Sequence, residues 1–462
     1  MRILGTSAAL AAALAVACGG DDAGGGDGGP GDGGGEMVDI AIAQLRQLDV
    51  LFVIDDSGTM VQEQQALASG FPAFVDALAG GDGETDLHIG FVSSNLGTAP
   101  AGTGGEGCAG EGDEGHLLVR SACPALTGDE LFVAHRIAAG GEAETNYTGE
   151  LADQLQCMAQ LGTGGCGFEQ HLESMKRALE NDAENAGFLR PEANLAVIVV
   201  ADEDDCSASD RALFIAQGSG DTRDSLLGEL TSYRCFEFGV ACAEDAEGER
   251  AIGPRTDCVP DDESTYIEPV GTYAQFLTEL KGGRHRVAVA SIVGDVEPVA
   301  VDLEPGLDRL WVVPECMVCP GGGSECTTLE ALVAAAPAIR LHALADRFSG
   351  RSQVEDICAY DDQAGALDYT AALARIGSRL RIDAGTRCLE TAPADRDPDA
   401  AGLQPLCEVV EGEQAIPSCS ELSAPCWSLA HAPECEGSET ALVIDRGDTE
   451  PAGGALTVRC AP

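Results

Sequence analysis

The chain has 462 residues, 44% of them hydrophobic and only 4% aromatic, so it can bury a substantial core built mainly from aliphatic side chains. It carries 78 acidic residues against 26 Lys and Arg, a formal net charge of −52. This charge repels phosphates, which argues against nucleic acid and anionic lipid headgroups as partners. It favours cations and basic surfaces, and we attribute most of the excess to a solvated acidic exterior.

The amino terminus predicts export and attachment to a membrane through lipid. Arg2 precedes an apolar segment from Ala8 to Ala17, and Cys18 follows it. A charged start, a short apolar core and small residues before a cysteine are typical of a bacterial lipoprotein signal, residues 1–18, with Cys18 as the lipidated residue. Ordinary secretion with an incidental cysteine is the alternative. Residues 19–36 are rich in Gly and Asp and predict a flexible tether that spans roughly 20–25 Å.

The cysteine count agrees with a cell-envelope location. The chain has 19 cysteines, and 18 remain if Cys18 is lipidated, which predicts up to nine disulfides in an exported protein. Gly19 favours the outer membrane, on its periplasmic face or at the cell surface, with the lipid anchor as the only membrane contact. We expect Cys108 and Cys123 to close one excursion of the chain. The cluster of Cys316, Cys319 and Cys326 also suits a zinc clip or a redox pair, but export favours structural disulfides.

Strands alternate with helices over residues 37–387. Predicted strands cover residues 49–54, 87–93, 195–201 and 286–293, and predicted helices cover 61–78, 168–180, 273–281, 338–348 and 367–380. Several strands are apolar throughout, as expected for parallel strands covered on both faces. The pattern predicts an α/β domain whose doubly wound, mostly parallel sheet is flanked by helices. Cysteine-bearing insertions are expected near residues 95–157, 203–270 and 296–335.

The composition changes at residue 388. Pro, Asp and Cys dominate residues 388–462, and short alternating runs at 441–445 and 455–459 replace helical patterns. The sequence therefore predicts a small, Cys-rich β module that needs disulfides because its core is small.

Oxygen-bearing side chains follow two of the predicted strands. Asp55, Ser57 and Thr59 come directly after the first strand, and Asp202 follows the most apolar strand. Thr163 lies on a Gly-rich turn that leads into a helix. Because the carboxyl ends of parallel strands meet at one edge of a sheet, we expect these five side chains to converge. Two carboxylates and three hydroxyls suit a hard cation, Mg²⁺ best and Mn²⁺ or Ca²⁺ less well. The alternative is that Asp55 or Ser57 only caps the next helix.

This pattern resembles the metal-ion-dependent adhesion site of von Willebrand factor type A domains. In that family Asp-x-Ser-x-Ser follows the first strand, a Thr lies on a later loop and an Asp follows the fourth strand. Thr59 replaces the last Ser here, Glu203 follows Asp202 where members often have Gly, and Thr148 is an upstream alternative to Thr163. The resemblance implies a type A fold over about residues 38–385. With its tether and Cys-rich tail, the chain also resembles envelope-anchored lipoproteins of this family, notably from myxobacteria.

The resemblance implies a binding module that is not an enzyme. In the family the metal keeps an open coordination position, which accepts an acidic residue from a protein partner. We therefore expect metal-dependent protein–protein interaction or adhesion. Two alternatives stay open: a metal-dependent hydrolase, which needs a general base beside the ion, and a structural envelope protein whose site holds no ion. The sequence has no Gly-x-Ser-x-Gly motif, Walker-type loop or metalloprotease helix.

Two further groups of residues are possible ligands. Asp204, Asp205 and Asp210 suit a second, calcium-like ion, although a solvated acidic loop is favoured. His88 lies inside a predicted strand, where a buried histidine with a hydrogen-bond partner is favoured over a ligand.

Overall fold

The computed structural model describes most of the chain beyond residue 36. The described residues are 37–79, 85–99, 107–138, 142–181, 183–216, 221–247, 250–318, 333–383, 385–397, 403–419, 424–433, 435, 437–447, 449 and 455–462. They form a mixed α/β protein with a seven-stranded, mostly parallel sheet, seven α-helices and eight disulfides. At this level the predicted fold class is confirmed. The predicted signal, Cys18 and the tether lie outside the described residues.

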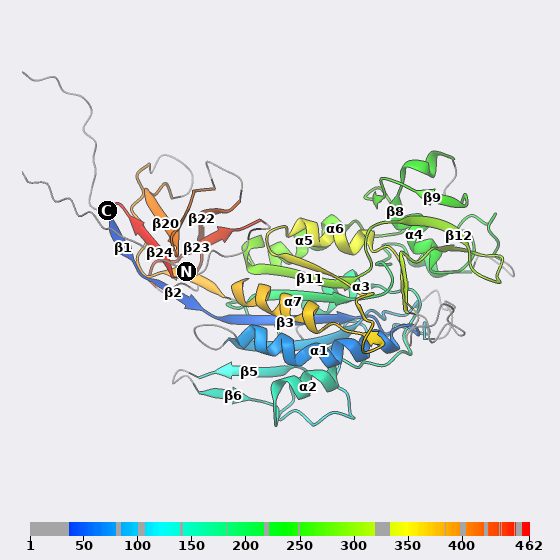
Figure 1. Ribbon diagram of the computed structural model, residues 1–462, viewed down its shortest axis with the longest axis horizontal. Coiled ribbons are helices and arrows are strands. Elements are labelled where there is room, and N and C mark those ends of the chain that lie inside the picture. Colours follow the sequence, from blue (N-terminus) through cyan, green and yellow to red (C-terminus); the bar gives the residue numbers. More distant parts are fainter. Residues whose placement is uncertain are drawn as a thin grey trace, which may run out of the picture.

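The main sheet places two apolar strands side by side at its centre. Its spatial order is β16 (Ser352–Asp356), β11 (Val287–Val293), β7 (Asn194–Val200), β3 (Gln47–Ile54), β4 (Asp86–Ser93), β5 (Val133–Ile137) and β6 (Ala143–Thr145) (Figure 1). The first five are parallel, and β5 and β6 extend the sheet antiparallel. From β3 the chain continues to β4 on one side and later returns to β7 on the other. Strand order reverses between β3 and β7, which is where open α/β sheets form a crevice.

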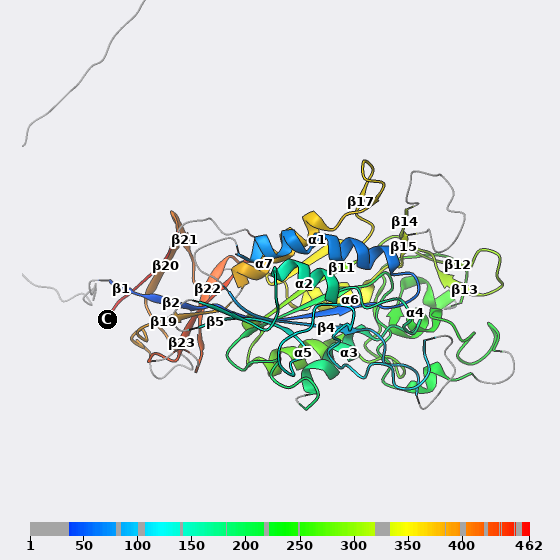
Figure 2. The ribbon, with the colours of Figure 1, turned by 90° about the horizontal axis from the view of Figure 1, so that it is seen from below.

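Helices cover both faces of this sheet (Figure 2). One layer contains α1 (Val61–Ala79), α2 (Leu151–Met158) and α7 (Thr370–Asp383), and the other contains α3 (His171–Glu180), α5 (Val270–Leu280) and α6 (Ile339–Arg347). Within β3, Phe52 belongs to the first core and Val53 to the second, because successive side chains of a strand point to opposite faces. The two cores are separate and fully buried, so the central strands are held rigidly from both sides.

Glycine allows the two helices of the first layer to approach closely. A Cβ added at Gly70 in α1 would lie 2.6 Å from Leu373 Cδ1 and 3.2 Å from the Tyr369 carbonyl carbon. At Gly377 in α7, a Cβ would lie 2.7 Å from the Phe74 carbonyl oxygen. Larger residues at these positions would push α1 and α7 apart and shift the start of α1, which lies next to the carboxyl end of β3.

The second and third predicted insertions join into one structure beyond the carboxyl edge of the sheet (Figure 1). Strand β9 (Gly253–Arg255) of the former pairs with β12 (Val299–Leu303) of the latter, and β12 pairs with β13 (Leu310–Val312). These insertions also contain α4 (Tyr233–Gly239), β8 (Val240–Ala241), β10 (Val259–Pro260), β14 (Cys316–Val318) and β15 (Val333–Ala335), with 3-10 helices at Arg211–Phe214 and Ala243–Glu247. Outside them, β17 (Tyr360–Asp361) and β18 (Ala366–Leu367) form a hairpin after β16, and a 3-10 helix at Arg284–Arg286 leads into β11.

The carboxyl-terminal module is a sandwich of two four-stranded sheets. One sheet has the order β1 (Val38–Ile40), β24 (Leu456–Cys460), β20 (Cys407–Glu411) and β21 (Gln414–Ile416), and the other β2 (Ile42–Leu45), β19 (Thr386–Leu389), β23 (Thr440–Asp445) and β22 (Cys426–His431). Their shared core includes Val409 and Val458 from the first sheet and Trp427 and Leu442 from the second. Strands β1 and β2, which the sequence pattern groups with the α/β domain, thus belong to the sandwich. The α/β part is inserted between β2 and β19.

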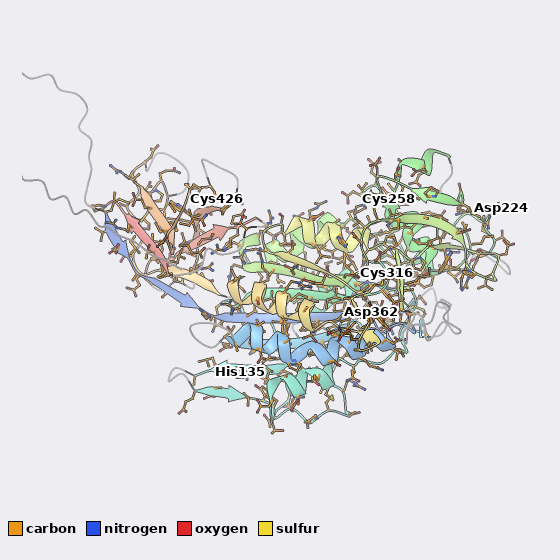
Figure 3. All side chains as sticks on the ribbon, in the orientation of Figure 1. His135, Asp224, Cys258, Cys316, Asp362 and Cys426 are labelled. Carbon is orange, nitrogen blue, oxygen red and sulfur yellow. A yellow bond between two sulfur atoms is a disulfide. The ribbon has the colours of Figure 1, made fainter. Side chains whose placement is uncertain are left out.

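Eight disulfides connect described cysteines. The pairs are Cys108–Cys166, Cys123–Cys157, Cys206–Cys235, Cys242–Cys258, Cys316–Cys358, Cys388–Cys435, Cys407–Cys460 and Cys419–Cys426. Figure 3 shows Cys426 in the sandwich and Cys258 in the joined insertions. The expectation that Cys108 and Cys123 close one excursion is wrong, because each pairs with a cysteine near the Thr163 loop instead. Cys319 and Cys326 lie outside the described residues. Within the described part of the chain, no helix has both the length and the hydropathy that a membrane span requires.

Candidate metal centre

The carboxyl end of β3 carries a fully buried carboxylate. The backbone N–H of Asp55 donates to the Val200 carbonyl at 2.9 Å, which fixes the end of β3 against the end of β7. Asp55 Oδ1 accepts a hydrogen bond from the Ser57 N–H at 2.7 Å, and this holds the turn after the strand. Asp55 Oδ2 is buried and has no hydrogen-bond partner among the described residues. One carboxylate oxygen therefore organises the loop, and the other accepts no hydrogen bond from a described residue, with the His171 ring 3.7 Å away from it.

The two hydroxyls of the motif extend from Asp55 toward the strand on the other side of the crevice. Ser57 Oγ and Thr59 Oγ1 are 3.1 Å apart. The Thr59 side chain hydrogen-bonds to Asp202, which lies two residues beyond the end of β7 and is 4% exposed. Asp202 Oδ1 is a second buried carboxylate oxygen without a hydrogen-bond partner in the described structure. The structure thus brings Asp55, Ser57, Thr59 and Asp202 to one place, the crevice between β3 and β7.

A side chain of α1 attaches the third predicted loop to this crevice. Gln64 Nε2 donates to the Asp55 carbonyl and to the Gly162 carbonyl, both at 2.8 Å, and the Gly162 N–H donates back to Gln64 Oε1 at 3.1 Å. Thr163 is the next residue along this loop and is half-buried. The loop that carries Thr163 therefore lies beside Asp55.

The same loop also contacts the first motif through its backbone. The Gly165 N–H donates to the Asp56 carbonyl at 2.7 Å, and a Cβ at Gly165 would lie 2.2 Å from Asp56 Oδ1. A larger residue at this position would have to displace the Asp56 carboxyl group. Thr148 is exposed and follows β6 at the edge of the sheet, with β4 and β5 between it and β3. Of the two threonines that the sequence offers, Thr163 is the one beside the crevice.

The carboxyl groups around the crevice resist ionisation. Burial raises the pKa of Asp202 well above its usual value, Asp55 and Glu203 add to this, and the hydrogen bond from Thr59 opposes it. Burial is also the first cause at Asp56 and Glu63, where it raises the pKa to about 7 in each case. Carboxyl groups placed this closely and this deeply are costly as anions, and a bound cation would remove that cost.

Sequence reasoning missed two buried groups behind Asp55. His171, the first residue of α3, is fully buried, and its Nε2 lies 3.7 Å from Asp55 Oδ2. Burial lowers the pKa of His171, but Asp55 more than offsets this, so the pKa is raised. Glu169 is likewise buried and shares a side-chain hydrogen bond with Glu203. His171 precedes Met175 by one helical turn, a spacing that predicts its burial, but nothing in the sequence links it to Asp55.

The acidic run after Asp202 has a structural role, and the expectation of a solvated loop is wrong for two of its members. Asp204 accepts from the backbone N–H of Arg340 at 2.9 Å and so caps α6. Asp205 is 1% exposed and pairs with the Arg340 guanidinium at 3.0 Å. Asp210 is exposed and caps a short 3-10 helix through Ala212. Each of the three carboxylates therefore has a protein partner.

His88 has the structural role expected of it. Its Nδ1 lies 3.0 Å from the Phe188 carbonyl oxygen, and Arg136 Nε donates to its Nε2 at 3.1 Å. Burial lowers the pKa of His88 to about 4, so the ring is neutral.

A second group of possible ligands lies at the neighbouring end of the sheet. Among the described residues, one group of acidic and cysteine side chains places its possible ligand atoms within 4.8 Å of one another. This group consists of Glu315, Cys316, Asp356 and Cys358. Cys316 and Cys358 are bonded to each other, so they offer no thiolates. The zinc clip considered for Cys316 is not formed, and this group retains only two carboxylates.

Comparisons with known proteins show weak structural likeness. No family model matches the sequence, and no curated protein matches it. A pilus adhesin, SpaC from Lactobacillus rhamnosus GG, is 13% identical over 90% of this chain with a TM-score of 0.30, and the chain spans 38% of that protein. A von Willebrand factor type A protein from Catenulispora acidiphila is 11% identical over 93% of this chain and 66% of its own, with a TM-score of 0.27.

An aerotolerance-related membrane protein from Bacteroides fragilis is 9% identical over 72% of this chain and 99% of its own, with a TM-score of 0.24. The chain is thus similar to proteins that include a type A domain protein. At these scores the likenesses carry no argument about what the chain does, and the functional argument rests on the residues of the crevice.

Proposed function

We propose that the chain is an envelope-anchored, type A-like lipoprotein that binds Mg²⁺ and uses it to hold a protein partner. The observation that carries this proposal is the crevice between β3 and β7, where two buried carboxylate oxygens, on Asp55 and Asp202, lack hydrogen-bond partners. The Ser57 and Thr59 hydroxyls lie between the two strand ends. Each carboxylate has a partner at its other oxygen, and the His171 ring lies 3.7 Å from Asp55 Oδ2. A buried carboxylate oxygen that accepts no hydrogen bond is still costly, and coordination of a cation is one established reason for keeping it.

The donor set fits a hard divalent cation. Hydroxyl and carboxylate oxygens from Asp55, Ser57, Thr59, Thr163 and Asp202 would hold Mg²⁺, with Mn²⁺ or Ca²⁺ as substitutes. When bound, the ion supplies a positive charge and a coordination position for a carboxylate of the partner. The residues of this chain supply the pocket that orients the ion.

We propose a binding role and no catalysis. A hydrolase at this site needs a general base that reaches a substrate or a metal-bound water. His171 is the described histidine that pairs with a proposed ligand, and it is fully buried, so it has no contact with solvent. Metal-dependent cleavage of peptide or phosphate-ester substrates by the purified protein, lost in Asp55→Ala, would favour the hydrolase instead.

The position of the crevice suits an anchored receptor. The predicted tether ends at residue 36, just before the sandwich, and the carboxyl ends of β3 and β7 lie at the edge of the main sheet that is remote from the sandwich (Figure 1). With the lipid on Cys18, the proposed site would lie away from the membrane. This suits the proposed attachment to the cell envelope, and Gly19 is the residue that favours the outer membrane.

Calorimetry on the oxidised protein without its signal peptide tests the metal site. Native protein should bind Mg²⁺ or Mn²⁺ with one site per chain, and Asp55→Ala should abolish this binding. Asp210→Ala is the matched control, because it removes the same charge from an exposed 3-10 helix and should bind as the native protein does. With Mn²⁺ bound, acetate should lower the water-proton relaxation enhancement by displacing metal-bound water. Equal binding by native protein and Asp55→Ala would overturn the proposal.

A further inference from the structure

A cavity of about 100 Å³ lies beside the crevice, between the sheet edge and the joined insertions. Its acidic wall contains Glu169, which precedes α3, and Glu203, which follows Asp202. Its aromatic wall contains Tyr233 and Phe236 from α4 and Trp311 from β13. The cavity is therefore built by the insertions on one side and by the loop of the proposed metal ligand Asp202 on the other.

The acidic wall holds carboxyl groups that the fold does not neutralise with a basic side chain. Glu169 is 1% exposed, and its Oε1 has no hydrogen-bond partner among the described residues. Its carboxyl group is hydrogen-bonded to that of Glu203. Within the described structure, no ion pair joins either residue to a Lys or Arg, and the nearby His171 ring already faces Asp55 at 3.7 Å. Asp204 also lines the cavity, but its carboxylate already accepts a hydrogen bond from the Arg340 N–H at the start of α6.

The aromatic wall provides the second half of a cation site. The faces of Trp, Tyr and Phe attract Arg and Lys head groups, most strongly where water is displaced. A cavity of about 100 Å³ is smaller than the roughly 300–1,000 Å³ that hold drug-sized ligands, so it suits one side-chain head group.

The charge of the crevice argues for the same ligand. Asp55, Asp56, Glu63 and Asp202 gather around the proposed ion, and Glu169 and Glu203 adjoin them. Those of these groups that ionise beyond the two charges of the ion would repel a purely acidic ligand. A ligand that carries a positive charge of its own would reduce this repulsion.

We propose that this cavity is a subsite for the guanidinium or ammonium group of a basic side chain, on a ligand whose acidic group reaches the adjacent metal centre. The basic half of this proposal stands on the cavity alone, and the acidic half rests on the proposed function. The insertions that wall the cavity would then select the partner, and the metal centre would capture it.

Binding of methylguanidinium to the full-length mature protein in EDTA tests the basic half without any metal. The chain has two tryptophans, Trp311 in the cavity wall and Trp427 in the sandwich core, so a saturable fluorescence change that disappears in Trp311→Phe reports the cavity. We expect Glu203→Gln and Glu169→Gln to weaken binding at least tenfold. Glu315→Gln, which removes a half-buried carboxyl group near the same sheet edge, should leave it unchanged. Methylurea, which has a similar shape and no charge, should not bind.

Equal binding of methylurea and methylguanidinium, or equal binding by native protein and Glu203→Gln, would overturn the subsite.

The acidic half is tested with capped peptides that contain one Arg and one Glu separated by zero to three glycines. Mg²⁺ should tighten binding at least tenfold at one spacing, and replacing Glu by Gln or Arg by citrulline should remove the gain. If methylguanidinium binds but Mg²⁺ adds nothing, the subsite stands and the proposed function fails. If Mg²⁺ binds but methylguanidinium does not, the proposed function stands and the subsite fails.

Discussion

Under the proposed function, Asp202 lowers the stability of the fold without a ligand and is stabilised when the ion binds. Its carboxylate is buried, one oxygen lacks a hydrogen-bond partner, and Asp55 and Glu203 lie close enough to raise its pKa. Without a cation, an asparagine of the same shape should be tolerated better than this carboxylate. We expect Asp202→Asn to raise the melting temperature in EDTA and to abolish the rise that Mg²⁺ produces in the native protein.

Asp205→Asn is the matched control for this change. Asp205 is equally buried, but the Arg340 guanidinium pairs with it, so Asp205→Asn should lower the melting temperature in EDTA because it leaves that charge unpaired. Differential scanning calorimetry distinguishes the two variants. A melting temperature that falls in Asp202→Asn as it does in Asp205→Asn would mean that Asp202 is structural and not reserved for an ion.

Glu63 gives a pH dependence whose sign follows from its pKa. Burial raises this pKa from 4.5 to about 7 in the folded protein, so the folded state keeps a proton that the unfolded state releases between those values. The stability from the protonated carboxyl is complete below pH 4.5 and is lost as the pH rises through 7. Glu63→Gln should therefore match the native free energy of unfolding at pH 4 and exceed it at pH 8 by on the order of 1–3 kcal/mol, in EDTA.

Urea unfolding at the two pH values measures this difference. Glu279→Gln, on the exposed side of α5, should give no comparable gain at pH 8. A gain of the same size at both pH values would show that Glu63→Gln acts through packing and not through ionisation.

At the scale of elements, the start of α1 positions two loops at once. Gln64 contacts the backbone of Asp55 and of Gly162, so one side chain holds the Asp-x-Ser-x-Thr loop and the Thr163 loop at a fixed separation. Gln64→Ala should cost roughly 1–3 kcal/mol of stability and weaken Mg²⁺ binding several-fold, because the third loop is no longer held. Calorimetric titration measures the affinity. Gln65→Ala, one residue along and exposed, should change neither, and equal effects of the two variants would contradict this role for Gln64.

The elements that the sequence predicts best are the buried ones. Strands β3 and β7 end in the apolar runs 50–54 and 195–200, and an acid follows each run, so the burial of these runs and the positions of Asp55 and Asp202 follow from the sequence pattern. The five predicted helices agree with the structure to within a few residues, as for α1, whereas α2 and α4 were not predicted. Glu169 and the aromatic wall escaped prediction because they come together through contacts between segments far apart in the chain, which no local sequence pattern records. The disulfide partners of Cys108 and Cys123 escaped for the same reason.

On the scale of the whole molecule, the amino-terminal strands tie together the two ends of the described chain. Val38 pairs with Cys460 in one sheet of the sandwich, and Leu45 pairs with Thr386 in the other. The short, alternating pattern of residues 38–45 is that of a half-buried strand, but no local signal says that its partners lie more than 300 residues away. The tether would thus enter the sandwich, and any load on the lipid anchor would reach the α/β part through it.

This arrangement predicts that the sandwich depends on its first two strands while the metal centre does not. Ile40 and Ile42 pack against the sandwich core that contains Trp427. In a Trp311→Phe background, Trp427 is the remaining tryptophan, and its fluorescence measures the unfolding of the sandwich. In that background, Ile40→Ala with Ile42→Ala should lower the free energy of unfolding of the sandwich by roughly 1–3 kcal/mol. Val38→Ala, at a position that is 53% exposed, should change it by less than about 0.5 kcal/mol. Mg²⁺ affinity should stay within twofold in all of these variants, because the crevice lies at the far end of the parallel sheet. A loss of Mg²⁺ binding that follows the loss of sandwich stability would show instead that the two parts unfold as one cooperative unit.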